Sequence, residues 1–411
     1  MNYFSEKKIG IFVDSNKNSG GVFQELSVFI KNFQQYNKKY GLKFEIISNN
    51  KNIKLHSDLD NIETKYFKLG IFQRALIYLI NYNFFFHKIN QLLKLKNKFE
   101  EYLKKNNFDF IIFTSTSQHS LYLVETNYCL WVQDVDHRDY LEFPEVGNLE
   151  PFLWKEGIYE KAIKRASIII TGCEIVKKRI ISLYNCLAER VLVLNQEPSL
   201  NVQNFDKNKN TEENLIFLKK YALSKKYIFY PAMYFPHKNH KLILDSLKII
   251  NFEKKEDISA VFCGHDKGYL QNLKKYSKKI KIEDKVRFFE FIKDEEIPFF
   301  YINSIALVMP TLMGPNNIPP WEAFKLKVPV FYSRFSNIDS VLKNAVYYID
   351  QFDPKILAEG VINLIHDEKI KDNLVKNGQN LFNSIDKKKD YEHLLDLIVK
   401  NRIIRERWNL S

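Results

Sequence analysis

The segment from Thr311 to Ser333 combines a turn, an acidic residue and a helix start in a spacing that suits a charged ligand. A Gly-Pro-Asn-Asn turn at 314–317 precedes a helix start at Pro319-Pro320, and Glu322 follows in the first helical turn. Free backbone N–H groups and the helix dipole at such a start favour an anion. A neighbouring carboxylate would repel phosphate but can accept hydrogen bonds from a ribose diol. The pattern predicts adjacent diphosphate and ribose sites, as a nucleotide-activated sugar requires.

A second loop supplies a cation. Lys238 lies between a strand and a helix in the run Tyr230–His240, where it could neutralise a leaving diphosphate. His237 and His240 flank it, but no carboxylate or cysteine is spaced to complete a metal set, so we interpret both as hydrogen-bonding residues. Gly264 ends another strand, where a ligand or a neighbouring backbone could approach closely.

The first half of the chain contains two candidate ligand loops. Gly20 and Gly21 follow a strand and precede a helix, which suits either a phosphate or sugar cradle or a structural turn. Asp134 and His137 lie in a charged run after a buried strand, where they could hold substrate or relay a proton, or the charges could pair with one another. Asp134-Val-Asp136 resembles a metal-binding D-x-D pattern, but the surrounding pattern is wrong for that fold, so no metal is expected.

Short β-branched runs that alternate with helical patterns position these residues. The expected strands are 9–13, 44–47, 110–114, 130–133, 168–171 and 191–194, then 227–230, 260–263, 286–289, 306–309, 328–332 and 346–349. This alternation predicts an α/β protein with two Rossmann-like, doubly wound parallel sheets facing across a cleft. We expect domains at 1–196 and 227–385, and a linker at 197–226 with one short helix at 213–221. A C-terminal helix at 386–411 is expected to pack back toward the first domain.

Composition limits the function classes. The chain has 411 residues, 45% hydrophobic content and a formal net charge of +13. The lysines are scattered without a nucleic-acid motif, so we expect no nucleic-acid partner; they solvate the surface or favour an anionic substrate or membrane. Four unpaired cysteines and the lack of a signal peptide predict a cytoplasmic protein. The apolar run 75–86 is too short to span a membrane, which leaves a buried or amphipathic helix, or peripheral contact with the inner face of an anionic membrane.

Together, these features resemble the glycosyltransferases of the two-domain GT-B fold, in the retaining group called family 4 or group 1. The resemblance covers nearly the whole chain. Its markers are Gly20-Gly21, the segment 166–177, Pro-His-Lys-Asn-His at 236–240, the Gly264 turn, 286–292, Pro-Pro-Trp-Glu-Ala-Phe at 319–324, and 353–367.

The resemblance implies a retaining, metal-independent transferase that needs no cofactor. Its donor, a UDP- or GDP-sugar, would lie mainly on the second domain, and its acceptor, a glycan or a lipid-linked glycan, would come from the first. A role in surface polysaccharide or lipopolysaccharide synthesis is expected. The donor-binding residues implied are Gly20, Gly21, His237, Lys238, Gly264, Phe291, Asn317, Ile318 and Glu322, and the catalytic residues are Asp134, His137, Lys238 and Glu322.

The chain departs from the family pattern at three positions. The first of two glutamates falls at Gly314, a common arginine falls at Ala232, and a histidine after the first-domain strand falls at Gln133. These departures keep two alternatives open, namely a nucleotide-sugar epimerase on the same fold and a non-catalytic protein that binds a nucleotide-sugar or glycan.

Overall fold

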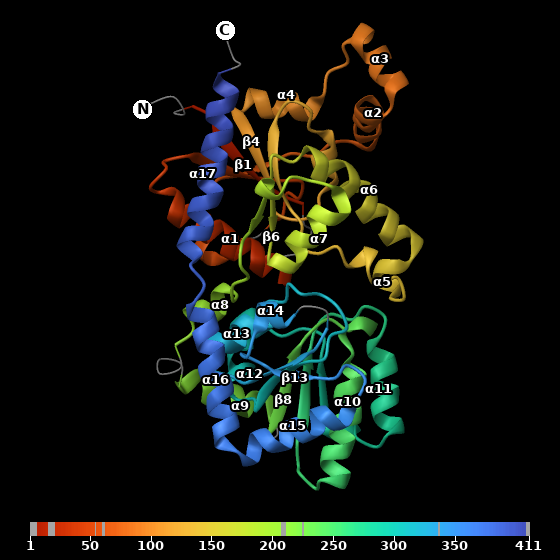
Figure 1. Cartoon of the computed structure of the whole chain (residues 1–411), viewed down its shortest axis with the longest axis vertical. Helices are drawn as coiled ribbons and strands as arrows, with labels where there is room; N and C mark the ends of the chain where they lie inside the picture. The colour runs from red at the N-terminus through yellow and green to blue at the C-terminus, as the bar shows by residue number, and fades with distance from the viewer. Residues whose placement is uncertain are drawn as a thin grey trace. The chain divides into compact units, whose positions relative to one another are not determined.

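The short β-branched and aromatic runs form two parallel sheets, which confirms the predicted α/β class (Figure 1). The computed structural model describes residues 6–14, 21–53, 55–59, 62–206, 211–223, 226–335 and 338–407. The chain divides into two units: the first takes Met1–Asp139, Val146–Asn195 and Asp386–Ser411, and the second takes Tyr140–Glu145 and Gln196–Ile385.

The sheet of the first unit has the strand order β3-β2-β1-β4-β5-β6-β7. Its strands are β1 (Lys8–Val13), β2 (Lys43–Ser48), β3 (Thr64–Tyr66), β4 (Phe108–Phe113), β5 (Asn127–Trp131), β6 (Ile168–Thr171) and β7 (Val191–Val193). Edge strand β3 was not predicted from the sequence, because its three residues Thr-Lys-Tyr are partly exposed and contain no apolar run. The longer helices are α1 (Gly21–Asn37), α2 (Ile71–Tyr82), α3 (Phe84–Leu93), α4 (Lys98–Lys105), α6 (Leu149–Arg165) and α7 (Glu174–Tyr184).

The C-terminal helix α17 (Lys387–Glu406) belongs to the first unit and packs beside α1. The Tyr391 ring stacks on Tyr36 with 5.5 Å between centroids and contacts Phe29 at 6.0 Å. Arg402 is buried and forms an ion pair with Asp109 of β4. Burial of these side chains attaches the end of the chain to a core built almost entirely from its first half.

The sheet of the second unit has the order β10-β9-β8-β11-β12-β13. Its strands are β8 (Tyr227–Pro231), β9 (Ser259–Cys263), β10 (Val286–Phe289), β11 (Ala306–Met309), β12 (Val330–Ser333) and β13 (Tyr347–Ile349). Its helices are α8 (Leu200–Asn204), α9 (Thr211–Tyr221), α10 (His240–Lys248), α11 (Leu270–Lys279), α12 (Ile297–Ile302), α13 (Pro319–Lys325), α14 (Asp339–Leu342), α15 (Pro354–His366) and α16 (Glu368–Asn383). The short helix α5 (Pro144–Gly147) spans the point in the chain where the second unit's segment ends at Glu145 and the first unit resumes at Val146.

The segment 197–226 contains two helices where the structure describes it, whereas one short helix was predicted. It contributes α8 and α9 to the second unit. Phe217 of α9 is buried and stacks on Phe299 of α12 with 5.6 Å between ring centroids. The many polar residues of this segment obscure the few buried apolar side chains that dock it, among them Leu200, Val202 and Phe217.

Each sheet has one point where the strand order reverses, between β1 and β4 in the first unit and between β8 and β11 in the second. In doubly wound parallel sheets, ligands bind beyond the carboxyl ends of the strands at such a point. We therefore expect a ligand site of each unit at these two positions.

Candidate functional site

Two loops of the second unit meet at the carboxyl ends of β8 and β11. The loop after β8 contains a short helical turn, Pro236–Lys238, and the loop after β11 contains Asn317. The Lys238 ammonium donates to Asn317 Oδ1 over 3.4 Å, and the Leu312 N–H donates to the His237 carbonyl over 2.8 Å. The fold thus brings Lys238 and Asn317, both predicted from the sequence, to the point where the strand order reverses.

Tyr332 supports this pair from the neighbouring strand β12. Its hydroxyl accepts a hydrogen bond from Asn317 Nδ2 over 2.6 Å and donates to the Gly314 carbonyl over 3.2 Å. Asn317 Nδ2 also contacts the Gly314 carbonyl. Tyr332 was missed in the sequence, although its place near the carboxyl end of the strand beside β11 is a signal that could have found it.

Gly314 adopts a backbone conformation that excludes the family glutamate. Its φ is +93°, in the left-handed region that glycine tolerates and other L-residues rarely adopt. A glutamate there would strain the turn that Asn317 and Tyr332 hold. The backbone conformation of this loop therefore requires glycine at position 314, where the family pattern has a glutamate.

Glu322 is buried in α13, with 7% of its surface exposed. Its carboxylate accepts hydrogen bonds from the Ser199 N–H over 3.3 Å and from the Tyr301 hydroxyl over 2.8 Å. Burial raises the pKa of this carboxyl group, and the two hydrogen bonds oppose that rise. Each carboxylate oxygen can accept a second hydrogen bond, so these two partners leave Glu322 able to contact a ribose hydroxyl. That contact stays a proposal.

The start of α13 offers fewer amides than the sequence pattern suggests. Pro319 and Pro320 have no N–H group, and the N–H groups of Trp321 and Glu322 donate to the Ile318 carbonyl over 2.9 and 3.3 Å. The amides of Asn317 and Ile318, which precede the helix, are the ones that a phosphate could contact. A phosphate here would depend on the loop and on Lys238 more than on this seven-residue helix.

His237 holds the Lys238 loop rather than facing solvent. Glu145 accepts a hydrogen bond from the His237 N–H over 3.2 Å and also contacts His237 Nδ1. Glu145 comes from the segment Tyr140–Glu145, which belongs to the second unit. It was missed as a partner because nearly a hundred residues separate it from His237 in the chain.

Gly264 resolves the alternative that the sequence left open. A Cβ atom on Gly264 would lie 2.3 Å from the Ala232 carbonyl oxygen, so a neighbouring backbone, not a ligand, makes the close approach. Ala232 is itself buried at the position where the family pattern has an arginine. Beyond β10, the Phe291 ring is 60% exposed and stacks on His265 with 6.4 Å between centroids, which leaves it open to a nucleobase.

We predict that Gly264→Ala lowers the free energy of unfolding by about 1–3 kcal/mol, because the added methyl group displaces packed backbone. The thermal unfolding midpoint would measure this loss. Gly21→Ala is the matched control, since a Cβ atom there meets nothing within 4 Å. Equal midpoints for the two variants would contradict the packing role of Gly264.

His240 is fully buried among aromatic rings. Its ring centroid lies 4.8 Å from Tyr230, 5.1 Å from Phe262 and 5.2 Å from Tyr234. Burial, together with the charge of Lys238, lowers the pKa of His240 to about 3. His240 is therefore neutral near pH 7 and contributes no charge to bind a diphosphate.

This depressed pKa predicts acid destabilisation. The unfolded chain takes up a proton at His240 near pH 6.5, whereas the folded chain does so only near pH 3, so stability falls as the pH decreases through that window. Between pH 7 and pH 5 the loss is about 2 kcal/mol. His240→Phe should lose that much less stability than the parent protein in urea titrations at the two pH values. An unchanged pH dependence in His240→Phe would disprove this assignment.

The sequence-predicted residues of the first unit pair with one another. Asp134 forms an ion pair with Lys155, while His137 is fully buried and its Nε2 lies 2.8 Å from Glu156 Oε2. Burial lowers the pKa of His137. Because His137 is buried in the core, a ligand cannot reach it. We therefore no longer propose His137 as a catalytic residue. The structure therefore shows that the charged residues of this run pair with protein partners, which is one of the two alternatives that the sequence left open.

Gly21 opens α1, and Gly20 lies outside the described residues. Gln133, at the position of the family histidine, donates from Nε2 to Glu25 Oε2 over 2.5 Å. Across the part of the chain that the structure describes, no three His, Cys, Asp or Glu side chains are grouped to hold a metal ion.

A cluster that sequence reasoning missed lies where the strand order reverses in the first unit. Asp14, directly after β1, accepts a hydrogen bond from Ser117 Oγ over 2.6 Å, lies 3.1 Å from His119 Nδ1, and contacts Asn49. Burial opposes ionisation of Asp14, but these partners, His119 first, lower its pKa overall. The sequence signal that could have found Asp14 is an acidic residue directly after a buried strand. The partners of Asp14 follow β2 and β4.

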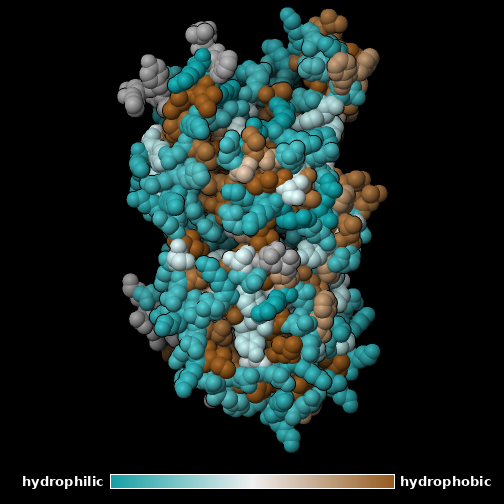
Figure 2. Space-filling view, viewed as in Figure 1, coloured by the Kyte–Doolittle hydropathy of each residue, from teal (hydrophilic) through white to brown (hydrophobic). Residues whose placement is uncertain are grey.

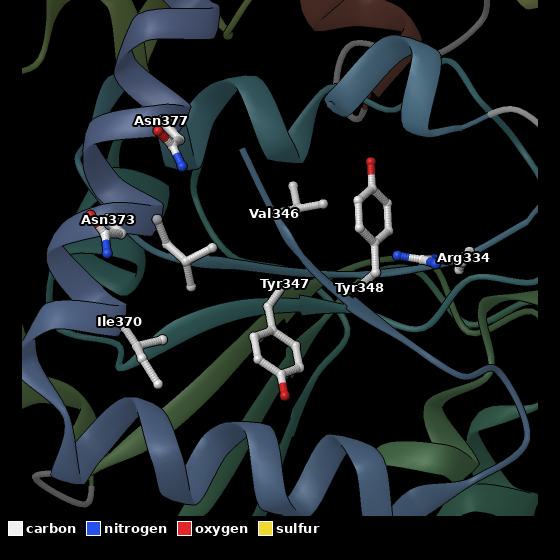
Figure 3. Close-up of a pocket in the computed structure, with 8 residues that line it drawn as sticks. Arg334, Val346, Tyr347, Tyr348, Ile370, Asn373 and Asn377 are labelled. Atoms are coloured by element: carbon white, nitrogen blue, oxygen red, sulfur yellow. The ribbon is translucent and has the colours of Figure 1, made fainter. Parts of the chain in front are cut away.

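A hollow of about 390 Å³ lies elsewhere in the second unit. Figure 3 shows Tyr347 and Tyr348 pointing to opposite sides of β13, with Asn373 and Asn377 projecting from α16. Because β13 is an edge strand two places beyond β11, this hollow is separate from the Lys238 site.

Solved structures show which fold these two units make. Anabaena HepE in complex with UDP-glucose superposes with a TM-score of 0.70 at 14% identity, covering 96% of this chain and 99% of that one. WaaG, a glycosyltransferase involved in lipopolysaccharide biosynthesis, superposes with a TM-score of 0.67 at 12% identity. The superposition covers 95% of this chain and 99% of WaaG. The fold is the GT-B fold of glycosyltransferases, as the sequence resemblance predicted.

Sequence comparison identifies the group. Residues 206–381 match the family "Glycosyl transferases group 1", and this part of the chain is a glycosyltransferase domain of that group. The O-antigen chain mannosyltransferase RfbU of Salmonella typhimurium is 22% identical over 262 residues, which cover 62% of this chain and 67% of that protein. O-antigen chain mannosyltransferase B of Escherichia coli is 21% identical over 226 residues, which cover 55% of this chain but only 58% of that protein.

Proposed function

We propose that this protein transfers a sugar from a UDP- or GDP-sugar to a hydroxyl group of a glycan or lipid-linked glycan, with retention of configuration and without a metal or other cofactor. The observation that carries the proposal is the meeting of Lys238 with Asn317 where the strand order of the second sheet reverses. The group 1 match and the O-antigen mannosyltransferase relatives support the reaction class and a role in surface polysaccharide or lipopolysaccharide synthesis.

In this proposal the Lys238 ammonium and the amides of Asn317 and Ile318 bind the diphosphate. Their positive charge and dipoles stabilise the negative charge that develops when the bond from the sugar C1 to the phosphate oxygen breaks. The acceptor oxygen forms the new bond to C1 on the same face, and its proton passes to the leaving phosphate. Glu322 accepts from the ribose hydroxyls, and Phe291 stacks on the base.

The acceptor would be bound by the first unit. Gly21 at the start of α1 and Asp134 after β5 stay proposed ligand contacts of this unit. A cytoplasmic location also stays a proposal, and the four free cysteines fit a reducing compartment.

A thermal-shift screen with UDP, GDP, UDP-glucose, GDP-mannose and ribose 5-phosphate tests the donor class. We expect one nucleoside diphosphate and its sugar to raise the unfolding midpoint at millimolar concentration, since a ligand that binds the folded state stabilises it by mass action. The proposal fails if none of the nucleotides does so. With the stabilising donor, a free epimer formed without acceptor would instead identify an epimerase, and binding without turnover would identify a non-catalytic protein.

A further inference from the structure

Helices α2 and α3 form a hairpin that projects from the edge of the first unit (Figure 1). Only Ile77 of α2 is buried, and no residue of α3 is buried. The hairpin is anchored by Ile77 and by the Asn81 side chain, which donates to the Leu121 carbonyl over 3.0 Å. Asn83 caps α3 by accepting from the N–H groups of Phe85 and Phe86, so the bend between the helices is well defined.

The outer surface of this hairpin is apolar. Phe72, Leu76 and Leu79 are exposed at i, i+4 and i+7 of α2, which puts them on one helix face. On α3, Phe85 is 66% exposed and Leu92 is 85% exposed, and Phe72 on α2 reaches 91%. Figure 2 shows hydrophobic residues gathered on the hairpin at the upper right of the view. Contiguous exposed apolar surface of this kind marks an interaction site.

Basic residues predominate along this part of the chain, although Lys96 pairs with Glu101 over 3.3 Å and Lys65 with Glu45 over 2.8 Å. From Thr64 to Phe99 the sequence contains seven Lys or Arg residues and no Asp or Glu. Lys88, Lys94 and Lys96 are exposed on or just beyond α3, and the Lys88 ammonium lies 5.6 Å from the centre of the Phe84 ring. An apolar helix surface bordered by basic residues is typical of a segment that lies in the headgroup region of an anionic bilayer.

Charge decides between the two simplest occupants. A symmetric dimer would place the same patch of each copy against the other, so it would bring like charges together. An anionic lipid surface offers negative headgroups to the lysines and acyl chains to the phenylalanine and leucine side chains. No helix among the described residues is long and apolar enough to cross a membrane, so the hairpin would lie in the interface plane.

We propose that the α2–α3 hairpin is a peripheral docking site for anionic membranes, with its exposed apolar side chains inserted between headgroups and its lysines against lipid phosphates. This site would hold the first unit at the bilayer surface. The inference does not rest on the proposed transfer reaction, because lipid binding is measured without a donor.

Vesicle flotation with the full chain tests the proposal. We expect binding to vesicles of 30% phosphatidylglycerol in phosphatidylcholine, and little binding to phosphatidylcholine alone. The triple variant Phe72→Ser, Phe85→Ser, Leu92→Ser and the triple variant Lys88→Gln, Lys94→Gln, Lys96→Gln should each bind the anionic vesicles at least about tenfold more weakly. Both change exposed side chains, so thermal unfolding should be unaltered.

Matched controls separate the hairpin from the overall charge of +13. Phe352, which is 79% exposed in the second unit, is changed to Ser, and the exposed Lys274, Lys275 and Lys278 of α11 are changed to Gln. These variants should bind vesicles like the parent. The proposal is overturned if the control variants lose as much vesicle binding as the hairpin variants, or if the parent does not bind vesicles. It is also overturned if the parent is a dimer that the apolar variant abolishes while vesicle binding persists. Donor-induced stabilisation should be the same in all the variants, so failure here is distinct from failure of the proposed function.

Discussion

Replacing Lys238 with methionine is expected to lower the affinity for the stabilising nucleoside diphosphate about 10- to 100-fold. Hydrogen bonds to a charged group contribute about 1.5–3 kcal/mol, and each 1.4 kcal/mol is about tenfold in affinity. Loss of sugar transfer should be at least as large, because the same charge stabilises the leaving diphosphate. Lys238 is only partly buried, so the unfolding midpoint should change little. Titration calorimetry with the diphosphate measures the affinity.

Lys241→Met is the matched control for charge. Lys241 lies one turn along the same segment, where its ammonium pairs with Asp245 over 3.1 Å and lies over the Tyr276 ring. It removes the same charge but should leave the diphosphate affinity unchanged. If both variants weaken binding equally, the effect belongs to net charge and the assigned role of Lys238 is wrong.

Glu322→Gln is expected to lower donor affinity while the fold stays intact. The amide oxygen can still accept from the Ser199 N–H, and the new amide group can donate to the Tyr301 hydroxyl, which lies 3.5 Å from the Pro319 carbonyl as an alternative acceptor. An amide accepts a ribose hydroxyl less strongly than a carboxylate does, by about 1–2 kcal/mol, or roughly 5- to 30-fold in affinity. Binding of the nucleotide and of its free base separates a ribose contact from a contact with the base.

Two further changes show whether the carboxylate acts on the ligand or only within the protein. Glu322→Ala leaves the Ser199 N–H buried without its acceptor and the Tyr301 hydroxyl with only the long contact to the Pro319 carbonyl, so it should cost about 1–3 kcal/mol of stability. Tyr301→Phe removes one internal hydrogen bond and should leave the nucleotide affinity near that of the parent. Unchanged affinity in Glu322→Gln, or an equal loss in Tyr301→Phe, would rule out the ribose contact.

The alternation of apolar runs and helical periods was sufficient to predict twelve of the strands, because strand formation at these positions follows from local patterns that the core then buries. It was not sufficient for β3, whose edge position requires little burial, or for the docking of the polar segment that carries α9, in which Phe217 is buried. In both cases the deciding contact comes from elsewhere in the chain.

The candidate site divides in the same way. Lys238 and Asn317 were predicted because a loop after a strand end in a doubly wound sheet is recognisable from sequence, and the β8–β11 adjacency then placed them together. His137 was predicted to be available to a substrate, but it is buried against Glu156. Whether a polar side chain is exposed depends on how distant segments pack around it, and a local sequence pattern does not show this.

By itself, the sequence determined the two parallel sheets, the loops that carry Lys238 and Asn317, the helix start that carries Glu322, and an acid-free basic segment around α2 and α3. Spacing and composition are properties of neighbouring residues. Only the tertiary structure decided that Gly264 accommodates the Ala232 backbone, that Pro319 and Pro320 leave α13 few amides for an anion, and that the hairpin's apolar faces stay uncovered. These outcomes depend on atoms brought together from distant segments, and on which surfaces the fold buries.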